Sequence, residues 1–102
     1  MMRQVDEIEA AFKRVRSSAM RVMGGDEASK DQSFHDIFDL NNEIGRLARD
    51  RPKTMPKMKE LQSYVNMITV GMKYDRMGDL REGLAVTEKS IKALKKDFDS
   101  AP

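Results

Sequence analysis

The first segment of the chain, residues 2–23, reads MRQVDEIEAAFKRVRSSAMRVM. Its apolar residues follow one another at spacings of three and four, which places them on one side of an α-helix with 3.6 residues per turn. The stripe consists of Val5, Ile8, Phe12, Val15, Ala19 and Val22. An amphipathic helix of this kind has to bury its apolar side against other helices or against a partner. The segment therefore predicts a long N-terminal amphipathic helix.

The same spacing returns in three later segments. The second stripe consists of Ile37, Leu40, Ile44 and Leu47, the third of Met58, Leu61, Val65, Ile68 and Met72, and the fourth of Leu80, Leu84, Thr87, Ile91, Leu94 and Phe98. We expect helices at about residues 2–23, 33–49, 55–77 and 80–98. A chain of 102 residues has room for one domain, 1–102. The prediction is an all-α protein, an antiparallel three- or four-helix bundle with a long first helix.

The third segment is apolar on more than one side. Besides its main stripe it carries a second one at Tyr64, Met67, Gly71, Tyr74 and Met77. Apolar stripes on two sides require neighbours on both. We therefore expect this helix to lie at the centre of the protein.

Residues that cap or interrupt helices mark the expected boundaries. The pair Gly24–Gly25 stops the first helix, and Ser33 is placed to cap the second. Pro52 prevents the second helix from continuing, and Thr54 is placed to cap the third. Gly78 supplies the positive backbone dihedral of a tight turn that ends the third helix. In the alternative, Gly78 lies inside one helix of about forty residues, as in a coiled coil, at a cost of about 1 kcal/mol relative to alanine.

Charge is unevenly distributed along the chain. Residues 46–59 hold six Lys or Arg against one Asp, a net of +5, whereas residues 1–45 have a net of −3 and residues 60–102 a net of zero, for +2 overall. The six basic residues are Arg46, Arg49, Arg51, Lys53, Lys57 and Lys59. Such a patch is able to contact nucleic-acid phosphates without reading sequence. The same pattern is also typical of an ordinary solvated surface.

Composition restricts the class of protein further. The chain contains no cysteine, which excludes disulfides, a thiol nucleophile and cysteine-ligated zinc. Acidic residues stand near the N-terminus where a secretory signal would be apolar, and no apolar run approaches the ~20 residues of a membrane span. We expect a cytoplasmic protein without a membrane span, with export by a route that needs no cleaved signal as an alternative.

The sequence offers little for catalysis. The single histidine, His35, has Asp39 one turn further on, which is typical of a surface ion pair, and no Gly-x-Ser-x-Gly motif surrounds a serine. His35, Asp36, Asp39 and Glu43 share one helical face, but metal sites in bundles need ligands from a second helix. The pair Gly24–Gly25 is not part of a phosphate-binding loop. We expect a non-enzymatic protein with no cofactor, no metal and no small-molecule substrate.

A helical-hairpin pattern follows in the second half of the chain. Gly71 is followed by Tyr74, by a turn at Gly78–Asp79 and by Gly83, and then by Glu88-Lys89-Ser90. With this spacing, residues 67–94 resemble a single tetratricopeptide-like helical hairpin. Met67, Thr87 and Lys95 stand where that family has a large residue, an aromatic and a closing proline. The resemblance implies a helical module that binds peptides or proteins, or a chaperone, although arrays of this kind need about three repeats.

A second resemblance covers about a dozen residues. Gln62 and the stretch Tyr64–Asp75, YVNMITVGMKYD, are similar to the C-terminal helix of type III secretion inner rod proteins. This resemblance implies a small helical subunit that polymerises inside a secretion apparatus. The present chain continues for about twenty residues beyond the point where that family ends.

These observations together favour a protein that acts by binding other proteins. We expect an assembly subunit, chaperone or adaptor that works as a homo-oligomer or with a protein partner, by helix-in-groove packing. The stripe of the first helix is the expected partner surface, and its alternative role is to complete the core of the monomer. A secretion-apparatus subunit of the inner rod type and a small nucleic-acid-binding protein are the alternative functions.

Overall fold

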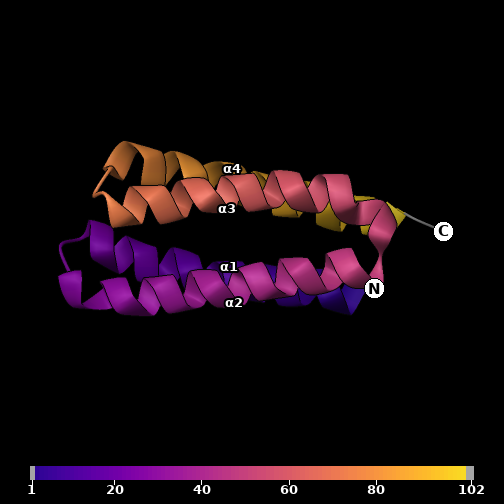
Figure 1. Ribbon diagram of the computed structural model, residues 1–102, viewed down its shortest axis with the longest axis horizontal. Coiled ribbons are helices and arrows are strands. Elements are labelled where there is room, and N and C mark those ends of the chain that lie inside the picture. The colour runs from indigo at the N-terminus through magenta and orange to yellow at the C-terminus, as the bar shows by residue number, and fades with distance from the viewer. Residues whose placement is uncertain (1, 101–102) are drawn as a thin grey trace.

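The computed structural model describes residues 2–100 and consists of α-helices joined by short connections (Figure 1). The helices are α1 (Met2–Met23), α2 (Lys30–Asp50), α3 (Met55–Lys73) and α4 (Met77–Ser100). Single 3-10 turns at Glu27–Ser29 and Pro52–Thr54 precede α2 and α3. No strand occurs in residues 2–100. The prediction of an all-α bundle with a long first helix is confirmed, with four helices in place of the three or four expected.

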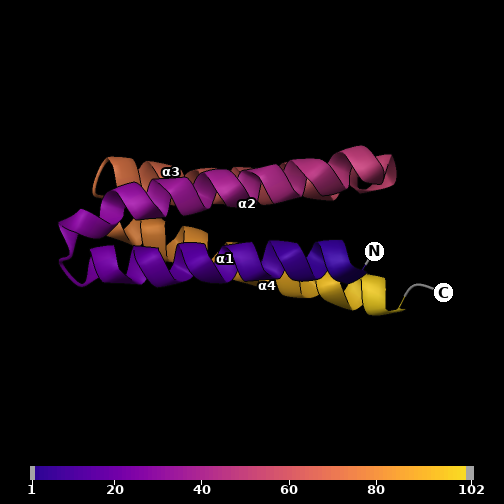
Figure 2. The ribbon, with the colours of Figure 1, turned by 90° about the horizontal axis from the view of Figure 1, so that it is seen from below.

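The helices form two antiparallel hairpins that stack on each other (Figures 1 and 2). One hairpin is α1 and α2 and the other is α3 and α4, with α1 packed against α4 and α2 against α3. Both chain ends and the α2–α3 connection lie at one end of the bundle, and the other two connections lie at the opposite end. The molecule measures 45 by 20 by 19 Å. This is an up-down-up-down four-helix bundle, in which each helix has two neighbours.

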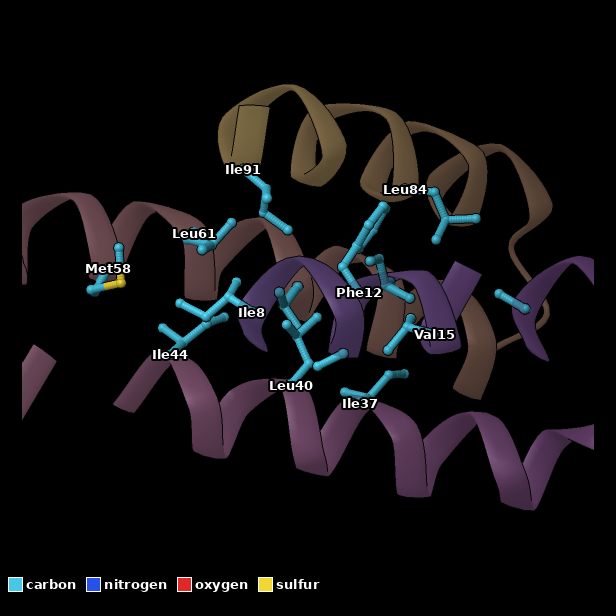
Figure 3. Packing of buried hydrophobic residues seen from close by; sticks show 14 of the residues in the cluster. Ile8, Phe12, Val15, Ile37, Leu40, Ile44, Met58, Leu61, Leu84 and Ile91 are labelled. Atoms are coloured by element: carbon cyan, nitrogen blue, oxygen red, sulfur yellow. The ribbon is translucent and has the colours of Figure 1, made fainter. Parts of the chain in front are cut away.

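The four apolar stripes meet along the axis of this bundle. Figure 3 shows side chains from all four helices in one cluster, among them Ile8, Phe12, Val15, Ile37, Leu40, Ile44, Leu61, Leu84 and Ile91. Every residue of the first three stripes is at most 4% exposed. The sequence periodicity therefore identified the core correctly.

Two hydroxyl groups meet inside the core where α1 packs on α2. Ser18 and Ser33 are both fully buried, and their Oγ atoms lie 3.2 Å apart. Ser33 therefore does not cap α2, which begins three residues earlier than expected, at Lys30. The 3-10 turn before α2 continues directly into the helix, so no separate cap is needed at residue 33. Thr54 does precede α3, but its hydroxyl donates to the Arg51 carbonyl (2.7 Å) and makes no cap hydrogen bond.

The turn between α3 and α4 lies at residues 74–76, so the turn predicted at Gly78 was wrong. Asp75 has a positive φ of 55°, and the Arg76 amide donates to the Gly71 carbonyl (2.8 Å). This is a Schellman-type helix end in which an aspartate takes the left-handed position usually held by glycine. Gly78 lies in the first turn of α4. The alternative of one continuous helix through Gly78 was also wrong.

Ion pairs on the surface join the two hairpins. Arg16 of α1 lies 2.8 Å from Glu88 of α4, and Lys95 of α4 lies 3.2 Å from Glu9. At the opposite end of the bundle, Lys30 lies 2.8 Å from Asp75. The hydrogen bonds in the last two pairs raise the pKa of each lysine. Ion pairs on the surface contribute at most about 1 kcal/mol each to stability.

Candidate interaction surface

The stripe that we expected as the partner surface lies in the core of the bundle. All six of its residues, Val5, Ile8, Phe12, Val15, Ala19 and Val22, are between 0 and 4% exposed. In the folded chain the stripe therefore has the second of the two roles that the sequence left open, which is to complete the core. Binding of a partner through these residues stays a prediction that requires α1 to leave the bundle.

The six residues of the basic segment do not act as one group. Arg46 lies 3.2 Å from Glu43 and 3.9 Å from Glu7, and Lys57 is paired with Asp97. Burial and a hydrogen bond with Glu7 raise the pKa of the Glu43 carboxyl. The other four, Arg49, Arg51, Lys53 and Lys59, are exposed around the α2–α3 connection. Four of the six basic side chains are thus exposed together at one end of the bundle.

Two glycines bring α3 and α4 into backbone contact near their connecting turn. A Cβ atom added at Gly71 would lie 2.7 Å from the Leu80 nitrogen, and one added at Gly83 would lie 2.9 Å from the Ile68 nitrogen. No larger residue fits at either position without moving a helix. The sequence flagged Gly71 as part of an apolar stripe, and the structure shows why it has no side chain.

A groove opens between α3 and α4 at the end away from this contact. It has a volume of about 410 Å³ and is lined by Lys57, Met58, Glu60, Leu61 and Tyr64 from α3 and by Val86, Lys89, Ser90, Ala93 and Leu94 from α4. Its floor is formed by the buried side chains of Met58, Leu61 and Leu94. Its walls are half-buried or exposed, so the groove is open to solvent. The groove thus lies at the end of the hairpin opposite to Gly71 and Gly83.

The second apolar stripe of α3 continues this groove along the outside of the hairpin. Tyr64, Met67 and Val70 are half-buried, and Tyr74 is 59% exposed. The expectation that α3 lies at the centre was wrong, because in this bundle α3 packs mainly against α2 and α4 and has no more helix neighbours than the others. Its second stripe is therefore left partly uncovered. We call the groove lining together with Met67, Val70 and Tyr74 the outer α3–α4 face.

Charged side chains border the outer α3–α4 face. The Tyr64 hydroxyl donates to Glu60 (2.9 Å), which raises the pKa of the tyrosine, and Lys57 is held by Asp97. Lys89 of α4 lines the groove, and Glu82 lies about two turns before it on the same helix. Both are exposed, and among the side chains that the structure describes neither has a hydrogen-bond or ion-pair partner. The face thus combines an apolar floor with one unpaired acidic and one unpaired basic side chain.

The residues considered for chemistry do not form a site in the described part of the chain. His35 and Asp39 lie on the exposed side of α2, with 3.7 Å between Nε2 and Oδ2. Among the side chains that the structure describes, no group of three or more His, Cys, Asp or Glu residues is placed to hold a metal ion. None of the helices in that range combines the length and the apolar character needed to span a membrane.

Comparisons with known proteins identify no relative of this chain. Family models, curated proteins and solved structures were each compared with the chain, and none matches it. The resemblances to a tetratricopeptide-like hairpin and to inner rod proteins therefore stay predictions.

Sequence reasoning missed the α4 side of this face. Val86, Ser90 and Ala93 lie outside the main stripe of α4, and only Val86 is a large apolar residue there. A signal was present in the second stripe of α3, which indicated that one more apolar surface needed a neighbour. The partner helix that forms the other wall could not be named before the pairing of α3 with α4 was known.

Proposed function

We propose that this protein is a non-enzymatic interaction protein that binds protein chains through the outer α3–α4 face. The observation that carries this proposal is an apolar-floored groove of about 410 Å³ that remains on the outside although the core is complete. Removing apolar surface from water gains roughly 25 cal/mol per Å², so a groove of this kind favours an apolar occupant. Helices that lie in such grooves anchor themselves through residues at spacings of three and four.

The proposal includes the roles of assembly subunit, chaperone and adaptor, in a cytoplasmic setting. An inner-rod-like subunit of a secretion apparatus is one form of assembly subunit and is therefore included in the proposal. No residue of α1 is needed for binding, because the surface is formed by α3 and α4 alone.

Site-specific photo-crosslinking tests the proposal. A photoreactive phenylalanine analogue placed at Val86 lies in the groove, and the same analogue placed at Asn42 lies on the exposed side of α2 and serves as the matched control. In extract of the source cells we expect protein adducts at position 86 that are absent at position 42. The same adducts at both positions, or none at position 86, would contradict the proposal. The mass of each adduct separates a second copy of the chain from a different protein.

A second function, contact with nucleic-acid phosphates, is favoured by one observation. Arg49, Arg51, Lys53 and Lys59 are exposed together at one end of the bundle. Binding to generic DNA or RNA should weaken steeply with salt if these residues carry it. Replacing Arg49, Arg51 and Lys53 by alanine should then abolish binding, and unchanged binding would exclude this function.

A further inference from the structure

The geometry points to a second copy of this chain as the occupant of the outer α3–α4 face. In the arrangement we infer, the two copies pack face to face, with α3 against α3 and α4 against α4 in antiparallel orientation. This inference rests on the proposed function, because it names the partner of the same surface. The two-fold axis of this dimer lies in the interface, crosses the helices at right angles, and passes between Ala85 and Val86 of α4.

The unpaired charges of α4 decide the arrangement. Glu82, Val86 and Lys89 follow one another at spacings of four and three, so they lie on one side of the helix. A two-fold axis midway between Glu82 and Lys89 brings each of them opposite the other residue in the second copy. Glu82 of each copy is then paired with Lys89 of the other copy, so the dimer contains two such ion pairs. A symmetric interface has to be self-complementary in this way.

With the same axis, residues of the second copy fill the groove. Gly83 packs on Ile68 and Gly71 on Leu80, so the level of Val86 on α4 corresponds to about residue 65 on α3. Rotation about that level places Val70 of the second copy over Leu61, and Tyr74 of the second copy over Lys57 at the edge of the groove. Tyr74, which directly follows α3, is 59% exposed and would be covered by this packing. The register set by the charges therefore also places Val70 and Tyr74 of the second copy over the groove.

The size of the surface is adequate for such a dimer. The face of the bundle that contains α3 and α4 is about as long and as wide as the molecule, which measures 45 by 20 Å. Standard-size interfaces bury about 800 Å² on each partner. The side of the bundle formed by α3 and α4 is therefore large enough for a specific dimer, and it includes the outer α3–α4 face.

Charge reversal combined with mixing tests the inference. By sedimentation velocity between 1 and 200 µM, we expect the wild-type chain to form a dimer. Glu82→Lys alone and Lys89→Glu alone each create two like-charged pairs per dimer and should weaken self-association by roughly tenfold or more. A mixture of the two variants restores opposite charges across the interface, so heterodimers should form at least as tightly as the wild-type dimer. The double variant should also regain self-association.

Matched controls come from the other hairpin. Lys13→Glu on α1 and Asp31→Lys on α2 change exposed charges far from the proposed interface and should leave the dimer unaffected, alone or mixed. Circular dichroism confirms that each variant is folded. A wild-type chain that stays monomeric at 200 µM would overturn the inference, as would a mixture of Glu82→Lys and Lys89→Glu that fails to associate. If position 86 still crosslinks other proteins in either case, the proposed function stands and only the identity of the partner is wrong.

Discussion

Replacing Gly71 by alanine tests the close contact between α3 and α4. The added methyl group would lie 2.7 Å from the Leu80 nitrogen, 2.9 Å from the Leu80 Cα and 3.0 Å from the Arg76 carbonyl oxygen. All three are backbone atoms, so no side-chain rotation relieves the overlap and α4 has to move. Overpacking of this kind costs about 1 to 3 kcal/mol, and the better helix propensity of alanine returns at most about 1 kcal/mol. We expect Gly71→Ala to lower the free energy of unfolding by about 1 to 2 kcal/mol.

The matched control for this substitution is Gly78→Ala. Gly78 lies in the first turn of α4, and an added Cβ atom there meets nothing within 4 Å. The same chemical change should therefore raise the free energy of unfolding by about 0.5 to 1 kcal/mol, since alanine restricts the unfolded chain without strain. The two variants should differ by roughly 2 kcal/mol, which is on the order of 10 °C in Tm for a domain of this size.

Urea denaturation followed by far-UV circular dichroism measures both values. Equal slopes in the two transitions would show that the variants differ in stability and not in the surface exposed on unfolding. A Gly71→Ala variant as stable as Gly78→Ala would refute the reasoning, because the backbones of α3 and α4 would then not be in contact.

Three further predictions follow from other parts of the molecule. Thr87 is fully buried, and its hydroxyl has no hydrogen-bond partner within the described residues. Thr87→Val should therefore raise the free energy of unfolding, measured by urea denaturation, by about 1 to 2 kcal/mol. A destabilised variant would contradict this. The pKa of Glu43 is raised above 4.5 in the folded chain, so its contribution to stability is present below pH 4.5 and is lost as the pH rises through the folded-state value. Glu43→Gln should therefore be at least as stable as the wild type at pH 7 and lose this advantage at pH 4, and the opposite pH trend in urea titrations would refute the assignment. Tyr74→Ala should change Tm little, because the side chain is 59% exposed. The same substitution should weaken self-association measured by sedimentation velocity. An unchanged dimer would place Tyr74 outside the interface.

The core could be predicted from the sequence because its signal is periodic. The spacing of Val5, Ile8 and Phe12 alone places these side chains on one side of a helix, and that side faces the core of the bundle. Periodicity does not say what covers a stripe, so the role of the α1 stripe in the folded chain needed the structure. The helix ends were less predictable, since Asp75 took the left-handed position expected for Gly78.

The outer α3–α4 face could be predicted only in part. The second stripe of α3 was visible in the sequence, with Tyr64, Met67 and Tyr74 at helical spacing. The facing residues of α4 depend on the register between the two helices, which the backbone contacts at Gly71 and Gly83 determine. Such contacts join residues far apart in sequence and leave no local pattern. The opposite charges of Glu82 and Lys89 became informative only when Lys89 proved to line the groove and both proved to be exposed without partners among the described side chains.

A single engineered cysteine tests the central claim most directly. The chain contains no cysteine, so Val86→Cys introduces the only thiol, next to the proposed two-fold axis. Disulfides form when two Cα atoms come within about 4.4 to 6.8 Å, which the antiparallel packing of α4 on α4 permits at this position. Under mild oxidation we predict a disulfide-linked dimer at low micromolar concentration, whereas Asn42→Cys on the exposed side of α2 stays monomeric. A Val86→Cys variant that crosslinks no faster than Asn42→Cys would contradict the claim that a second copy covers the outer α3–α4 face.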